Sequence, residues 1–359
     1  MAKEGILVIN PGSTSTKIAL FQGETMIFEE ILRHSMEEIA SFGGVSGQFD
    51  FRRRALEGLL KEKDVELDSL AAVVGRGGFL RPIEGGTYKV TPAMVAELRE
   101  GAQGEHASNL GGPLAMEVGR AAGIPAYIVD PVVVDELGPL ARVTGMAGIV
   151  RRSAFHALNQ KAVARRAAKD LGSRYQDLNL IVAHLGGGIS VGVHSRGRVI
   201  DVNNALDGDG PFAPERSGGV PVGDLISLCF SGELTEKEIK RRVVGGGGLV
   251  GYLATNDARE VEKLIEAGNE KAQLYYEAMA YQIAKEIGAG ATVLKGQLDA
   301  IVLTGGIAHS KILTGWIHDR ISFLAPVLIY PGEGEMEALA QGALRVLRGE
   351  EEARVYEKD

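Results

Sequence analysis

The chain has 359 residues, which is long enough for two packed domains, because a single hydrophobic core usually stops growing at about 250 to 300 residues. Hydrophobic residues make up 45% of the sequence and charged residues 24%, which indicates a globular protein rather than a disordered or fibrous one. Its 39 Lys and Arg against 47 Asp and Glu give a net charge of -8, which argues against nucleic-acid binding through a basic face.

The start of the chain and its single cysteine bear on the cellular compartment in which the protein is expected. The first residues, MAKEGILVIN, hold an apolar run too short for a signal peptide or a membrane span. A single cysteine excludes a disulfide within the chain. We therefore expect a cytoplasmic protein that binds no membrane. Cys229 lies in the apolar run 224–230 and is predicted to be a buried, small hydrophobic side chain.

The first half of the chain begins with three short predicted strands and their turns, at 6–9, 17–21 and 25–31. The elements predicted after this β-meander are a helix, a strand, two helices and a strand, at 49–63, 70–74, 92–100, 113–122 and 125–129. Strands that alternate with helices are typical of the βαβ units of an α/β protein.

The second half repeats this order after a helical stretch at 153–171. Its predicted elements are a second meander, two helices, a long helix and a strand, at 180–184, 189–194, 198–202, 222–230, 236–243, 257–287 and 300–303. We place the domain boundary near residue 155. The first domain is then 1–155 plus 334–359, with the C-terminal helix returning to it, and the second is 156–333.

The two meanders overlay at a single sequence offset. Three pairs of residues are each 174 positions apart: Asn10 and His184, Gly12 and Gly186, Gly23 and Gly197. A glycine-rich chain can match two glycines by coincidence, but the common offset favours a duplicated domain with a cleft between the copies. Such a cleft, with a glycine-rich turn from each copy, suits a nucleotide.

The first loop, Asn10-Pro-Gly-Ser-Thr-Ser-Thr-Lys17, places hydroxyls and one ammonium group on a tight turn. Backbone N–H groups, the hydroxyls of Ser13 and Ser15 and the charge of Lys17 all suit phosphate oxygens. The alternative is an ordinary polar hairpin turn. The loop is not a P-loop, because no glycine precedes the lysine and no helix clearly follows it.

The second loop contains three consecutive glycines, Gly186, Gly187 and Gly188, which let the backbone approach an anion closely. His184 precedes them at the end of a strand, where it is either catalytic or structural. The third loop, 303–309, ends another apolar strand and fits the adenosine side of a nucleotide, although an ordinary turn is an alternative. The absence of HExxH and CxxC spacing argues against a protein-ligated transition metal.

These motifs resemble, in order and over nearly the whole chain, those of the acetate and butyrate kinase family, and the similarity is greatest to its butyrate kinase branch. The segments that carry the resemblance include INPGSTSTKIALF, VAHLGGGISVGVHSRGRVID, DGPFAPERSGG, LTGGIAHS and YPGEGEMEALAQGALR. The resemblance implies an α/β fold of two duplicated ribonuclease-H-like domains, with mixed sheets flanked by helices. It also implies a homo-oligomer, a dimer or higher.

The resemblance also assigns roles to individual residues. It implies that phosphate is held by Asn10, Ser13, Ser15, Lys17 and His184 to Gly188, and adenosine by Gly305, Gly306 and Ile307. Asp130 resembles an active-site carboxylate, and Arg216 an arginine that faces the transferred group. Glu335, with Asn10, resembles the magnesium site, although Glu333 and Glu337 are close enough for a shifted register. Arg76 departs from the pattern, since it lies where the family carries a histidine, and we expect it to contact the substrate carboxylate or to leave that role to another residue.

The implied reaction is transfer of the γ-phosphoryl group of Mg·ATP to a short-chain carboxylate, most similar to butyrate, which gives an acyl phosphate and ADP reversibly. A carboxylate is already ionised at neutral pH and needs no general base. Other acceptors within the family are acetate, propionate and branched fatty acids. From other classes, a sugar or polyol kinase with Asp130 as base and an actin- or chaperone-like nucleotide-gated interaction module remain alternatives. An NAD-dependent dehydrogenase is disfavoured, because no Gly-x-Gly-x-x-Gly follows the first strand.

Overall fold

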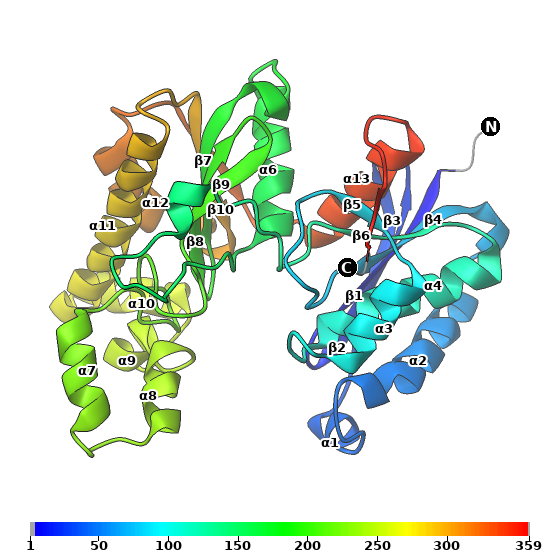
Figure 1. Ribbon diagram of the computed structural model, residues 1–359, viewed down its shortest axis with the longest axis horizontal. Coiled ribbons are helices and arrows are strands. Elements are labelled where there is room, and N and C mark those ends of the chain that lie inside the picture. Colours follow the sequence, from blue (N-terminus) through cyan, green and yellow to red (C-terminus); the bar gives the residue numbers. More distant parts are fainter. Residues whose placement is uncertain (1–3, 358–359) are drawn as a thin grey trace. The chain divides into compact units, whose positions relative to one another are not determined.

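The computed structural model describes residues 4–357, which form two compact units. Unit 1 comprises the residues up to Val134 and from Gly334 onward, and unit 2 runs from Asp135 to Glu333. The first boundary between the units therefore lies between residues 134 and 135, whereas the boundary predicted from the sequence lies near residue 155. The chain returns to unit 1 at Gly334, and its last helix, red in Figure 1, lies with the blue strands of that unit.

Unit 1 contains a seven-stranded mixed sheet in the order β12-β5-β6-β4-β1-β2-β3. The strands are β1 (Gly5–Pro11), β2 (Ser15–Gln22), β3 (Thr25–Arg33), β4 (Leu70–Arg76), β5 (Thr87–Lys89), β6 (Ala126–Val129) and β12 (Arg354–Val355). Strands β1, β4 and β6 run parallel, and β1 to β3 form an antiparallel meander. All of β1 is buried, which explains its continuous apolar run, because central parallel strands are covered on both faces.

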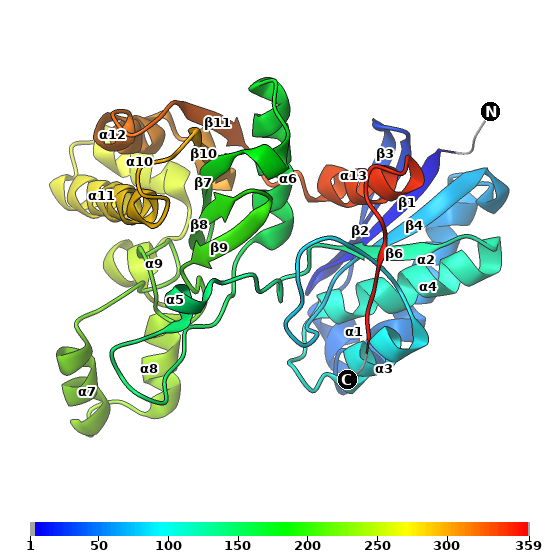
Figure 2. The same cartoon turned by 45° about the horizontal axis from the view of Figure 1, so that its top comes forward.

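Helices cover both faces of this sheet, as Figure 2 shows for α13 on one side and α4 on the other. The helices of unit 1 are α1 (Met36–Ala40), α2 (Phe49–Glu62), α3 (Pro92–Glu100), α4 (Gly111–Ala122) and α13 (Glu335–Leu347). The side chains of Leu7, Val73 and Ile128 pack into one core cluster with Leu114 of α4. Glycines bring α4 close to β4: a Cβ on Gly75 would lie 2.1 Å from the carbonyl oxygen of Gly111.

Unit 2 contains a five-stranded mixed sheet in the order β11-β10-β7-β8-β9. The strands are β7 (Asn179–Leu185), β8 (Ile189–Ser195), β9 (Arg198–Val202), β10 (Ala300–Gly305) and β11 (Val327–Pro331). The helices are α5 (Pro139–Arg142), α6 (Ala157–Asp170), α7 (Val222–Phe230), α8 (Glu236–Val243), α9 (Gly248–Leu253), α10 (Ala258–Glu266), α11 (Glu270–Val293) and α12 (Lys311–Ile321). Alternate residues of β7 enter two cores, Leu180 and Val182 on the α6 side and Ile181 and Ala183 on the α11 side.

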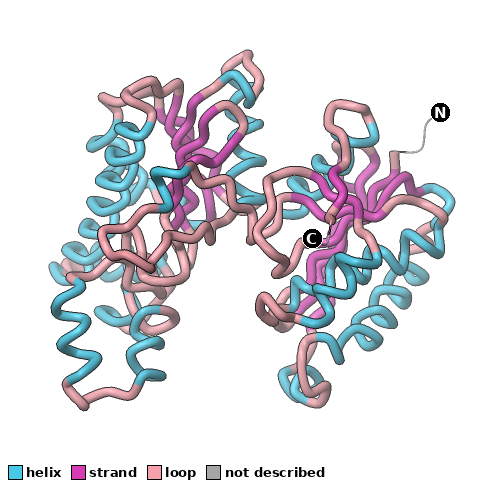
Figure 3. Tube along the Cα trace, in the orientation of Figure 1, coloured by secondary structure: helices cyan, strands magenta, loops and turns pink. Residues whose placement is uncertain are grey.

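The two units share one strand order. In each, an antiparallel meander is followed by two parallel strands on the far side of its first strand: β3-β2-β1-β4-β6 in unit 1 and β9-β8-β7-β10-β11 in unit 2. Figure 3 shows the strands of each unit as one magenta layer with cyan helices beside it. The predicted α/β fold with two mixed sheets flanked by helices is therefore confirmed.

The single offset of 174 holds for the first strand of each meander and fails for the second. Pro11 pairs with Thr16, whereas Leu185 pairs with Ile189, so the first turn is one residue shorter in unit 2. The equivalence of Gly23 and Gly197 is therefore wrong by one position. Arg196, with φ +49°, takes the place of Gly23, with φ +59°.

Three local expectations are corrected. The predicted long helix is interrupted at Gly268, whose φ of +82° ends α10 before α11 begins. The helix expected from 153 begins at Ala157. Cys229 is exposed, because α7 buries none of its residues despite their apolar character. Within 4–357, no helix is both long and apolar enough to span a bilayer.

Candidate active site

Polar side chains gather at one edge of the unit 1 sheet. Asn10 lies near the end of β1, Arg76 is the last residue of β4, and Asp130 directly follows β6. Because these strands run parallel, their carboxyl ends meet at the same edge, where α/β proteins bind their ligands. The fold thus brings together three residues that are 54 to 120 positions apart in the sequence.

Glu335, the first residue of α13, joins two of these residues. Its Oε2 accepts a hydrogen bond of 2.8 Å from the amide of Asn10, and its Oε1 forms an ion pair with Arg76. Burial raises the pKa of Glu335, but the charge and hydrogen bond of Arg76, assisted by Asn10 and Lys17, outweigh it and lower the pKa below the usual value. Of Glu333, Glu335 and Glu337, it is therefore Glu335 that contacts Asn10 and Arg76.

This cluster suits magnesium only together with a ligand that supplies further oxygens. One carboxylate and one amide oxygen are few protein ligands, but Mg²⁺ often keeps several waters and takes substrate phosphates. Between residues 4 and 357, no group of three or more His, Cys, Asp and Glu side chains is arranged to hold a metal ion. Asn10 and Glu335 would thus serve a phosphate-bound ion rather than form a complete metal site.

Asp130 is held rigidly beside this cluster. It is 1% exposed, its Oδ1 accepts from the amide of Gly86 at 2.7 Å, and its own amide donates to the Gly86 carbonyl at 3.0 Å. Its φ of +37° is unfavourable for a residue with a Cβ, and such strain is found where surrounding structure enforces it, often at functional sites.

The first loop joins β1 to β2 and has an outer and an inner side. Ser13 and Thr14 are exposed on the outer side, and Ser15 and Lys17 are half-buried. On the inner side lies the buried guanidinium of Arg52, which donates to the carbonyl oxygens of Ser13 and Ser15. Arg52 was not predicted from the sequence, because three consecutive arginines, 52 to 54, look like a run of solvent-exposed charged side chains. Arg52 lies four residues before the buried Leu56, and this spacing places both side chains on the same face of a helix. The spacing could therefore have identified Arg52 as buried.

In unit 2, His184 lies near the end of β7, at the position that Asn10 takes in β1. His184 is 3% exposed, and its Nδ1 is 2.7 Å from Oδ1 of Asn159. The Asn159 amide nitrogen donates to the carbonyl of Glu333 at 2.7 Å, so its oxygen faces His184 and accepts from Nδ1–H. The imidazole of His156 stacks on His184, with centroids 3.8 Å apart and planes inclined by 10°. Asn159 and His156 thus fix the ring and its tautomer.

The glycines of the second loop make room for two side chains. A Cβ on Gly186 would lie 2.9 Å from Nε2 of His184, and a Cβ on Gly188 would lie 1.7 Å from Nη1 of Arg216. Gly187 is exposed, and its Cβ would meet its nearest neighbour, Glu215, at 3.6 Å. The structure therefore brings His184 and Arg216 to the same loop.

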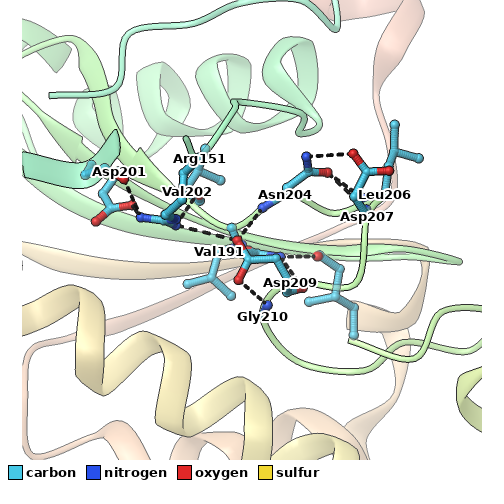
Figure 4. A network of polar contacts seen from close by, with 12 residues as sticks. Arg151, Val191, Asp201, Val202, Asn204, Leu206, Asp207, Asp209 and Gly210 are labelled. Carbon is cyan, nitrogen blue, oxygen red and sulfur yellow. Dashed lines mark hydrogen bonds and ion pairs between the residues drawn. The ribbon is translucent and has the colours of Figure 1, made fainter. Parts of the chain in front are cut away.

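Arg216 is held by the segment 203–210. Its Nη1 donates to the carbonyl of Ala205 at 2.5 Å, and burial lowers the pKa of its guanidinium, which nevertheless stays protonated at neutral pH. Arg151 forms ion pairs with Asp209 of this segment at 3.6 Å and with Asp201, two residues before it, at 2.8 Å (Figure 4). Asp209 also accepts a hydrogen bond from the backbone N–H of Asn204.

The third loop packs against the second. Gly305 has a φ of +89°, and a Cβ there would lie 2.4 Å from the carbonyl oxygen of Leu185. Gly306, which is exposed, and Ile307, which is half-buried, follow in a 3₁₀ turn that leads to Ser310, the N-cap of α12. Only glycine fits at 305, because a side chain there would overlap the backbone of the second loop at Leu185.

Comparison with solved structures finds proteins of similar fold. An acetate kinase from Porphyromonas gingivalis superposes with a TM-score of 0.79 at 22% identity, covering 96% of this chain and 100% of that one. A propionate kinase from Francisella tularensis gives 0.71 at 20% identity, covering 94% and 98%. An acetate kinase from Entamoeba histolytica gives 0.73 at 18% identity, with the same coverage. These matches show the fold: an α/β fold of two units, like that of these kinases.

The sequence match is more specific than the shared fold. Residues 140–314 match the model of the Acetokinase family. This segment, which contains the second loop, Arg216 and the third loop, is therefore similar in sequence to the Acetokinase family. The match does not extend to the cluster of Asn10, Arg76, Asp130 and Glu335 in unit 1.

Proposed function

We propose that this protein is a carboxylate kinase that transfers the γ-phosphoryl group of Mg·ATP to a short-chain fatty acid, with butyrate as the acceptor. The observation that carries the proposal is the loop of glycines 186–188, because His184 and Arg216 both lie directly against it, within the segment that matches the Acetokinase family. Backbone N–H groups, an imidazole and a guanidinium together suit a phosphoryl group in transfer.

Each residue has a role in this proposal. Arg216 neutralises charge on the transferred group, which is the main requirement when two anions react. His184 donates a hydrogen bond from Nε2, and because Nδ1–H is committed to Asn159, it can do so only as the imidazolium. The third loop, with Gly305, Gly306 and Ile307, binds the adenosine.

The predicted site residues of unit 1 have roles of their own in this proposal. Ser13, Ser15 and Lys17 bind phosphate oxygens, and Asn10 and Glu335 support Mg²⁺, which would supply charge neutralisation when bound with the nucleotide. Arg76 contacts the substrate carboxylate, because a guanidinium has five N–H donors and the pair with Glu335 engages Nη1. Asp130 orients this edge of the sheet through its two hydrogen bonds with Gly86, and no proton has to be removed because the acceptor carboxylate is already ionised at neutral pH.

The reaction class is tested by trapping acyl phosphate with hydroxylamine while ADP release is followed. We expect ADP and hydroxamate in equal amounts with butyrate. ADP without hydroxamate when glycerol or a sugar is added would instead identify a polyol or sugar kinase. Slow ADP release that no acceptor accelerates would identify a nucleotide-gated module.

The choice of butyrate is tested by comparing acids of different length. Two further methylene groups, each worth about 0.8 kcal/mol on burial, give butyrate a roughly tenfold higher kcat/KM than acetate in a fitted pocket. Measurement at saturating Mg·ATP with acetate, propionate, butyrate and isobutyrate decides the matter. An equal or higher kcat/KM for acetate would reject butyrate and leave the broader carboxylate kinase.

A further inference from the structure

Arg52 of α2 is almost completely buried. It is 1% exposed and heads the fully buried side chains when these are ordered by volume. No Asp or Glu among residues 4–357 forms an ion pair with it, and burial lowers the pKa of its guanidinium. Arginines in such places are normally paired, since a buried charge without a partner is costly.

Its hydrogen bonds go to neutral oxygens, and most of them lie on the first loop. Nη1 donates to the carbonyl of Ser15 at 2.8 Å and to the hydroxyl of Thr16 at 2.9 Å, and Nη2 donates to the carbonyl of Ser13 at 3.2 Å. Nε and Nη2 both donate to Oε1 of Gln48, at 3.1 and 2.9 Å. The guanidinium therefore fixes the loop from behind without losing its charge to a carboxylate.

This arrangement sets the direction of one amide of the loop, that of Thr14. In a trans peptide, the N–H of one residue points opposite to the C=O of the residue before it. Because the Ser13 carbonyl faces Arg52, the amide of Thr14 points to the outer side, where Ser13 and Thr14 are exposed. An anion on the outer side would meet this amide with a positive charge behind it.

The charge acts on neighbouring groups. Burial and then Arg52 lower the pKa of His34, whose Nε2 is 2.9 Å from the hydroxyl of Thr16. Burial, Arg76 and Arg52 lower the pKa of His106. A second buried cation gives the contrast: Lys161 of α6 is 2% exposed, but both oxygens of Glu136 lie within 3.0 Å of its Nζ. Lys161 is neutralised within the protein, and Arg52 is not.

We propose that Arg52 is a positioning residue that holds the loop 12–15 open toward solvent and supplies a permanent positive charge for the oligophosphate chain bound there. The proposal rests on the proposed function for the nature of the ligand. It goes further in assigning part of the phosphate affinity to a residue that the ligand does not touch. It also explains why a buried arginine here has no acidic partner.

The decisive variant is Gln48→Glu, which replaces the neutral acceptor of Arg52 by a carboxylate of the same shape. It keeps the guanidinium and its bonds to the loop but neutralises its charge, at the loss of one weak bond of 3.4 Å from Gln48 to the Gly44 carbonyl. The matched control is Arg54→Gln, which lowers the net charge equally on the exposed side of the same helix. Arg52→Gln removes the charge directly, and Arg52→Lys retains it.

Affinities for tripolyphosphate, ATP and adenosine are measured by calorimetry, with the melting temperature of each variant recorded. We expect Gln48→Glu and Arg52→Gln to weaken tripolyphosphate and ATP binding by about tenfold, Arg52→Lys and Arg54→Gln by less than about threefold, and adenosine binding to stay unchanged. Gln48→Glu should fold as stably as the wild type, so that its loss of affinity cannot be attributed to unfolding.

Wild-type tripolyphosphate affinity in Gln48→Glu would overturn the proposal, as would equal losses in Arg52→Lys and Arg52→Gln. The proposed function can fail separately. A wild-type protein that binds tripolyphosphate in an Arg52-dependent manner, yet forms no acyl phosphate from any acid, would reject the carboxylate kinase and leave this inference standing.

Discussion

The two units have the same strand order but support the turn after their first strand by different means. In unit 1, the turn has serine and threonine side chains on its outer side and the charged Arg52 behind it. In unit 2, the turn is one residue shorter and consists of glycines, and the charge of Arg216 lies directly against the backbone. Duplicated topology therefore fixes where each turn lies, and the side chains around it determine how an anion is approached.

Among the variants that distinguish the two turns, Arg216→Ala is expected to have the largest effect on activity. The guanidinium stabilises charge during transfer, so its loss should lower kcat by about 10² or more with little change in ATP affinity. Arg216→Lys should restore little, because lysine lacks the planar fork of donors. Steady-state kinetics with butyrate and direct ATP titration measure both quantities. A near-normal kcat for Arg216→Ala would show that Arg216 does not stabilise the transferred group.

A smaller loss is expected when Arg216 is kept but displaced. The Cβ of Gly188→Ala would overlap Nη1 of Arg216, which can move as the end of a flexible side chain, so the protein should fold and kcat should fall by roughly tenfold. Gly187→Ala is the matched control, because its Cβ meets its nearest neighbour at 3.6 Å. Equal activity of the two variants would contradict the close approach of Arg216 to the loop.

The contribution of the Glu335 carboxylate in unit 1 can be tested through the pH dependence of stability. Because the pKa of Glu335 in the folded protein lies below its usual 4.5, its ionised form stabilises the fold above about pH 4.5, and this contribution disappears as the pH falls through the lowered value. Glu335→Gln should therefore lower the melting temperature at pH 7 by roughly 3 °C, and the difference should shrink below pH 4.5. Glu337→Gln, in the same turn but exposed, should show neither effect.

Glu286 of α11, in unit 2, should respond in the opposite direction. It lines a cavity of about 250 Å³ with Arg151 and Asp201, where burial and the charges of Asp209 and Asp201 raise its pKa against the opposing charge of Arg151. Stability then falls as the pH rises above about 4.5, because the charged form is disfavoured in the fold. Glu286→Gln should raise the melting temperature at pH 7 by about 1 °C, with Glu270→Gln on the same helix as control. A lowered melting temperature would contradict this sign.

Local patterns predicted the strands and most of the loops well, since period-two apolar runs and glycines at strand ends depend on neighbours in the sequence. They also placed Asn10 and His184 at equivalent positions of β1 and β7. The offset failed at Gly23, because a pattern of identities does not reveal a deletion of one residue within a turn.

Properties that depend on distant contacts were missed. Cys229 lies in an apolar run, yet composition does not tell whether anything packs on α7. The pairing of Arg76 with Glu335 joins residues 259 positions apart, and no local signal announces it. The role of Arg52 follows from the carbonyl oxygens that face it, which only the folded backbone defines.

The exposure of Cys229 has a practical consequence. It is the one cysteine of the sequence, and it lies on the surface of unit 2, so a maleimide dye would label the natural protein at a single position without mutagenesis. A second cysteine at the exposed Lys61 on α2 would add an acceptor dye to unit 1. Energy transfer between the two dyes would then report, in real time, how the separation of the units responds to nucleotide and to each acid.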